Sequence, residues 1–148
     1  MRRLLVVLFL LVGLASTAVA QTSDSHRADV DSLIGIWGAE IDNSTGTGAD
    51  WLIINIKNNG VFNRVLRYQD NDGFHKTSGG ESITGHWGVG ESPIGTRIFC
   101  AKRDDQSPTV CQSFIIDAEG SLVYGNGIFR KLTAEELEIA GLTDWSKE

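Results

Sequence analysis

Apolar and polar residues alternate with a period of two along most of the chain after residue 32. The alternating runs are short, and Gly, Asn, Asp and Ser collect in the three to seven residues between them. Such a pattern is typical of antiparallel strands with one buried face and disfavours βαβ units. It predicts eight strands, over 33–42, 49–57, 61–69, 81–90, 95–103, 109–117, 121–124 and 128–132. We therefore expect an all-β barrel or sandwich built as a meander.

Asn59-Gly60 provides the strongest hairpin signal. A three-residue loop at 58–60 gathers most apolar side chains on one face, whereas two-residue loops scatter polar residues over both faces. The cross-strand pairs on the apolar face are then Leu52–Leu66, Ile54–Arg64 and Ile56–Phe62. We take this face as the inner one and the mixed face, which carries Trp51, Ile53, Asn55 and Val65, as the outer one.

This register places Arg64 and Tyr68 on the inner face of the hairpin. A bare guanidinium is costly to bury, so Arg64 must be solvated, paired or bound to an anion. One reading has Arg64 in water near the barrel mouth or paired with Asp50 or Glu81. The other has it meet the anionic head group of a ligand.

The one helix of the domain is predicted in the C-terminal region. Thr133 and Glu136 form a capping box, and Leu132 and Leu137 form a hydrophobic staple across it. Gly141 is a natural stop, so we expect a helix at 134–140 packed on the outside of the strands.

The first twenty residues read as a secretory signal peptide. Two Arg residues precede an apolar run of about twelve residues, which is short for a membrane span. Cleavage is expected after Ala20, which predicts a periplasmic or secreted chain; an uncleaved anchor is the alternative. Residues 21–32 are polar and aperiodic, so we expect a flexible tail, followed by a single domain at 33–148.

Charge and cysteine content narrow the partners and the compartment. The full chain carries a net charge of −6, and removal of Arg2 and Arg3 would leave 11 basic against 19 acidic side chains, or −8. Because nucleic acids are bound mainly through Lys and Arg, we expect no nucleic-acid partner. The two cysteines, Cys100 and Cys111, fall opposite each other when 104–107 forms a four-residue turn, and this predicts a disulfide.

The sequence contains no motif of a known catalytic or cofactor site. The histidines, His26, His75 and His86, are widely spaced, and no partner can be placed beside His86 from the sequence. We therefore expect no enzyme, no metal site and no cofactor.

Gly35-x-Trp37 opens the first strand, and the same spacing recurs in Gly85-His86-Trp87. Together with eight meandering strands and a terminal helix, this resembles the lipocalin-like (calycin) families of small secreted barrels. The resemblance implies an eight-stranded antiparallel up-and-down barrel with a short C-terminal helix. It also implies that Trp37 lies at the closed end, with Arg130 of the last strand packed on its ring.

The expected function is non-enzymatic binding of a small hydrophobic or amphipathic ligand inside the barrel. The expected ligand-binding residues are Arg64 and Tyr68 for a head group and Leu52, Ile54, Phe62, Leu66 and Trp87 for the apolar part. The alternative is an envelope protein-interaction or inhibitor module, similar to lysozyme inhibitors, that acts through loops 43–49, 70–80 or 104–107.

Overall fold

A computed structural model describes residues 30–41, 48–76 and 82–147. The chain divides into two compact units, Met1–Ser32 and Leu33–Glu148. The expected signal peptide and most of the expected tail lie outside the described residues. The second unit contains strands β1 (Gly35–Ile41), β2 (Ala49–Ile56), β3 (Val61–Asp70), β4 (Gly73–Lys76), β5 (Ile83–Glu91), β6 (Arg97–Arg103), β7 (Val110–Ile116), β8 (Leu122–Tyr124) and β9 (Gly127–Lys131), then helix α2 (Ala134–Ile139) and the 3₁₀ helix η1 (Thr143–Lys147).

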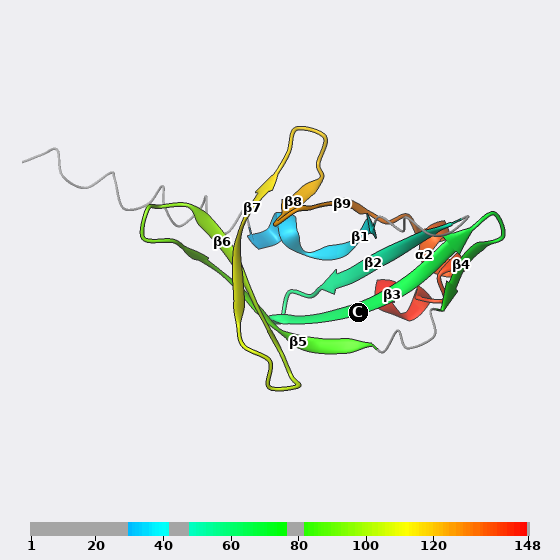
Figure 1. Cartoon of the computed structure of the whole chain (residues 1–148), viewed down its shortest axis with the longest axis horizontal. Helices are drawn as coiled ribbons and strands as arrows, with labels where there is room; N and C mark the ends of the chain where they lie inside the picture. Colours follow the sequence, from blue (N-terminus) through cyan, green and yellow to red (C-terminus); the bar gives the residue numbers. More distant parts are fainter. Residues whose placement is uncertain (1–29, 42–47, 77–81, 148) are drawn as a thin grey trace, which may run out of the picture. The chain divides into compact units, whose positions relative to one another are not determined.

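Eight of these strands close into a barrel in which neighbours in sequence are neighbours in space (Figure 1). Every pairing is antiparallel, and the ring is completed where β1 pairs with both β2 and β9. β4 stays outside the ring, because it pairs only with the end of β3. The expected eight-stranded antiparallel up-and-down barrel is confirmed.

The hairpin of β2 and β3 has the register that the apolar pattern selects. Leu52 pairs with Leu66, Ile54 with Arg64 and Ile56 with Phe62. Gly60 has a φ of +79°, the left-handed conformation that the three-residue loop requires. A one-residue slip would reverse the faces of both strands, so this register decides which residues line the barrel.

The inner faces of the strands form the first of two hydrophobic clusters. Its buried members are Leu33, Trp37, Ala39, Ile56, Phe99, Phe114, Leu122 and Phe129. Leu52, Ile54, Trp87 and Val89 pack against them from the same inner face, which confirms its orientation. Aromatic rings therefore fill much of the barrel.

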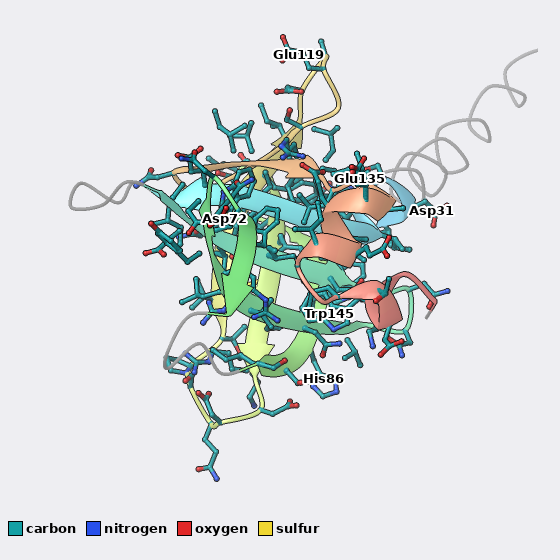
Figure 2. All side chains as sticks on the ribbon, turned by 90° about the vertical axis from the view of Figure 1, so that its right-hand side faces the viewer. Asp31, Asp72, His86, Glu119, Glu135 and Trp145 are labelled. Carbon is teal, nitrogen blue, oxygen red and sulfur yellow. A yellow bond between two sulfur atoms is a disulfide. The ribbon has the colours of Figure 1, made fainter. Side chains whose placement is uncertain are left out.

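The second cluster lies on the outer face of β1 to β3, beneath α2 and η1. Ile53 is fully buried there, together with Trp51, Val65 and Leu137. Figure 2 shows Trp145 beside the helix, and its carbonyl oxygen accepts a hydrogen bond from the buried Asn55 amide at 3.4 Å. The outer face, which carries both apolar and polar residues in the sequence pattern, is thus a second core, because the C-terminal segment covers it.

Helix α2 begins as its capping box predicts. The Thr133 hydroxyl accepts a hydrogen bond from the Glu136 amide at 3.2 Å, and the Glu136 carboxylate accepts one from the Thr133 amide at 2.9 Å. At the other end, the Arg67 Nε donates to the carbonyl oxygen of Ala140 at 3.1 Å and ties β3 to the helix terminus. The expected helix, including its position outside the barrel, is confirmed.

The expected disulfide is also present. Cys100 and Cys111 are directly opposite in the β6–β7 register and are bonded. No described helix is long and apolar enough to span a bilayer.

The region after β3 differs from the sequence reading. We expected a turn and loop at 70–80, but β3 runs to Asp70 and β4 returns along it. The turn is as expected, since the Asp70 carboxylate accepts a hydrogen bond from the Asp72 amide at 2.9 Å, and residues 77–80 lie outside the described residues. Phe74 of β4 is buried against Trp51, with ring centroids 5.7 Å apart. This contact with the second core stabilises β4. The residues around Phe74 are mostly polar, so the sequence pattern did not predict a strand there.

Gly85 has a packing role that requires the absence of a side chain. A Cβ atom at this inner-face position would overlap the Lys102 carbonyl oxygen and lie 2.6 Å from the Phe62 ring. Gly88, on the same strand but outer in register, has open space around it.

Candidate ligand-binding site at the barrel mouth

One end of the barrel interior is closed by two tryptophans that are held by hydrogen bonds. The Trp37 indole donates to the Leu33 carbonyl oxygen at 2.8 Å, and the Trp87 indole donates to that of Lys57 at 2.9 Å. Trp87 also stacks on Phe99, with centroids 5.7 Å apart. This part of the interior is therefore built from fixed aromatic rings.

The inner-face side chains become more exposed toward the other end of the barrel. Along β1 it increases from 1% at Trp37 to 5% at Ala39 and 41% at Ile41. Along β3 it increases from 5% at Phe62 to 38% at Leu66. We call this end of the interior the mouth and define it by Ile41, Leu52, Ile54, Arg64, Leu66 and Tyr68.

The mouth exposes apolar surface on the concave side of the sheet. Leu52 and Ile54 are half-buried, and Leu66 lies directly opposite Leu52. Exposed apolar surface costs about 25 cal/mol per Å², so an apolar ligand that covered it would gain that free energy.

Arg64 is the cationic group of the mouth. It is half-buried, and it forms no hydrogen bond or ion pair with any residue that the structure describes. Burial is the main cause that lowers the pKa of Arg64, and the positive charge of Arg103 lowers it further. Of the two sequence-based readings, pairing with Asp50 is not observed, and Glu81 lies outside the described residues.

Arg103 is a second inner-face guanidinium, which the sequence reading missed. It follows Phe99 and Ala101 at a period of two, and both of these face the inner core. Arg103 forms an ion pair with Asp105, yet its Nε is buried without a hydrogen-bond partner. The alternation from Phe99 was the available signal, but it could be used only once the face of β6 was known.

The remaining predicted ligand-binding residues divide between the mouth and the packed interior. Tyr68 is half-buried at the mouth, opposite Asp50 in the β2–β3 register. Phe62 is buried over Gly85, and Trp87 is held at the closed end. The candidate site therefore comprises Arg64, Tyr68, Leu52, Ile54 and Leu66, while Phe62 and Trp87 form its floor.

The predicted contact between Arg130 and Trp37 is wrong. Arg130 lies over the Trp51 ring, 5.0 Å from its centroid, on the outside of the barrel. The reason is the register of β9 on β1, which pairs Arg130 with Gly38 and Lys131 with Trp37. Lys131 consequently takes the place over the Trp37 ring, with its Nζ 5.1 Å from the centroid.

His86 is exposed at the surface of the barrel (Figure 2). Its Nδ1 is 3.2 Å from a carboxylate oxygen of Asp104, a partner that the sequence reading did not find. With Lys102, Arg103 and Gln106 these residues line an open depression of about 410 Å³. Within the described ranges, no three His, Cys, Asp or Glu side chains are grouped to hold a metal ion.

Three loops were expected to carry the contacts of an interaction module. Of the three, only 104–107 lies wholly within the described residues, and Asp104 and Asp105 already pair with His86 and Arg103. The acidic groups of this turn are therefore engaged within the chain.

Comparisons with protein-family models, with curated proteins and with solved structures found no match.

Proposed function

We propose that this protein is an exported, non-enzymatic binding protein that holds a small amphipathic ligand in the mouth of its barrel. The observation that carries the proposal is the inner wall at Leu52, Ile54 and Leu66, which remains partly exposed beside an Arg64 that forms no hydrogen bond or ion pair with a described residue. An apolar chain would cover the wall, and an anionic head group would meet the guanidinium.

The energies of the two contacts suit a ligand of modest size. Each methylene that leaves water contributes about 0.8 kcal/mol. A hydrogen bond to a charged group adds about 1.5–3 kcal/mol. Since the closed end is filled by Trp37 and Phe99, the ligand must be a short chain or a small ring and not a long lipid inserted along the whole barrel.

Export is supported by the disulfide and by the N-terminal sequence. Cys100 and Cys111 are bonded, and such bonds persist mainly in oxidising compartments outside the cytosol. Cleavage after Ala20 would release the barrel into the periplasm or the medium. Mass spectrometry of the purified native protein reports the cleavage site and any bound ligand together.

Methyl NMR during a titration with octanoate tests the binding proposal. We expect saturable shifts of the Leu52, Ile54 and Leu66 methyl groups and no shift at Ile128, which is 67% exposed on the outer face. Leu66→Gln should weaken binding at least about threefold, because it places a polar amide on the apolar wall, and Ile128→Gln is the matched control. The absence of saturable mouth shifts at millimolar octanoate, or equal shifts at Ile128, would refute the proposal.

A further inference from the structure

The two inner-face arginines lie close enough to share one ligand group. Arg64 is on β3 and Arg103 is on β6, with only β5 between them. In register, Arg103 is opposite Gly85, Gly85 is opposite Phe62, and Arg64 is two residues beyond Phe62. Two strand spacings of about 4.8 Å and a two-residue offset of about 6.6 Å separate the Cα atoms by about 11–12 Å, a span that two extended arginine side chains can close.

Gly85, which lies between the two arginines in register, has no side chain. Phe62 lies over it and forms an apolar floor. The strand between the arginines therefore places no charged inner-face group between them, since its other residue in this row is Ile83.

Part of the hydrogen-bonding capacity of the two guanidinium groups is unused. Asp105 is the described carboxylate beside the two guanidinium groups, and Arg103 holds it in an ion pair. Hydrogen bonds from Ser107 are the main cause that holds the pKa of Asp105 below its ordinary value, so Asp105 stays anionic. Several N–H donors are left over, including the buried Nε of Arg103.

We infer that Arg64 and Arg103 together bind a phosphate monoester head group in the mouth of the barrel. This inference rests on the proposed function and specifies the class of its ligand. A single carboxylate is satisfied by one bidentate guanidinium, whereas a phosphate monoester offers two charges and three acceptor oxygens to two guanidinium groups. Asp105 then acts as an internal competitor for Arg103 and lowers the affinity for weaker anions.

Octyl ligands that differ only in the head group separate this inference from simple apolar binding. Calorimetric titrations with octyl phosphate, octyl sulfate, octanoate and octanol keep the chain constant. At about pH 7.5 we expect octyl phosphate to bind at least about tenfold more tightly than the other three, because only it is a dianion. Equal affinities for octyl phosphate and octyl sulfate would overturn the inference and leave the proposed function standing, whereas no binding of any octyl compound would overturn both.

The pH dependence supplies an independent reading, because the second pKa of a phosphate monoester is about 6. The affinity for octyl phosphate should fall several-fold between about pH 7.5 and pH 5, while that for octyl sulfate stays constant. The protein's own titratable and charged groups around the site, among the described side chains, are Asp50 of β2, Arg64 and Tyr68 of β3, Arg103 of β6 and Asp105 of the following turn. Titration of any of these would change octyl sulfate binding too, so parallel pH profiles for the two ligands would contradict the inference.

Three charge-changing variants test the residues themselves. Arg103→Met should weaken octyl phosphate binding by about tenfold or more, since it removes a charge-assisted contact. Lys102→Met removes the same charge from the adjacent position on the outer face and should leave the affinity unchanged. Asp105→Asn removes the competitor and should raise the affinity several-fold. Equal losses in Arg103→Met and Lys102→Met would show that only net charge matters and would refute the shared phosphate site.

Discussion

Protonation of Glu136 should remove most of the stability that its contact with Arg130 provides. The two side chains form a bidentate pair, with N–O distances of 3.0 and 2.5 Å, and Glu136 also accepts the Thr133 amide within the capping box. Since Arg130 lies over the Trp51 ring, the pair joins α2 to the barrel wall.

The magnitude follows from the pKa of Glu136. The hydrogen bond from Arg130 is the main cause that lowers this pKa from its ordinary value of 4.5 to about 2. A shift of that size corresponds to at most about 3.4 kcal/mol, at about 1.36 kcal/mol per pKa unit. Arg130 is 47% exposed, so solvent screening reduces the expected contribution to about 1–2 kcal/mol.

The sign of the pH dependence is fixed by the lowered pKa. The contribution is complete above the unfolded-state value of 4.5 and is lost as the pH falls through about 2 in the folded state. At about pH 2.5 the linkage relation leaves about a quarter of it.

Urea unfolding of Glu136→Gln, followed by circular dichroism at both pH values, measures this contribution. The variant should be about 1–2 kcal/mol less stable than the parent at pH 7, and only about a quarter of that difference should remain at about pH 2.5, because the carboxyl of the unfolded parent is then almost fully protonated. Glutamine still offers an acceptor to the Thr133 amide, so the capping box is retained. Glu135→Gln is the control, because Glu135 is exposed in the same helical turn. A stability difference for Glu136→Gln that is the same at both pH values would refute the ionic explanation.

Further stability predictions concern packing and covalent structure. Gly85→Ala should destabilise the barrel by about 2 kcal/mol or more through overpacking, whereas Gly88→Ala on the same strand should change stability by less than about 0.5 kcal/mol; equal effects in urea unfolding would contradict the packing argument. Replacing Cys100 and Cys111 with Ser should cost about 2–3 kcal/mol, since the disulfide closes a short loop; an unchanged melting temperature would contradict this. Ile53→Ala should cost about 2–5 kcal/mol because its side chain is fully buried, and a loss below about 1 kcal/mol would show that the second core is loosely packed.

Part of the candidate site was predictable from residues close in sequence, and part depended on how distant strands pair. Arg64, Leu52 and Leu66 were predictable, because they share a hairpin whose register is set by its own turn and side chains. Arg103 was not assigned, since its face depends on the pairing of β6 with β5. Likewise, the interaction of Arg130 with Trp51 depends on how β9 pairs with β1 at closure, and a shift of one residue there decides which ring it meets.

By itself, the sequence determined the features that depend on neighbours along the chain. The alternation of apolar residues defined the strands, the turn at Gly60 defined a register, and the capping box defined the start of α2. The apolar pattern also selected the inner face of β2, but only the tertiary structure decided that the other face is covered by the C-terminal helices and becomes a second core. That covering brings together residues far apart in sequence, such as Ile53 and Leu137, and a pattern of neighbouring residues does not predict which distant segment packs on a face.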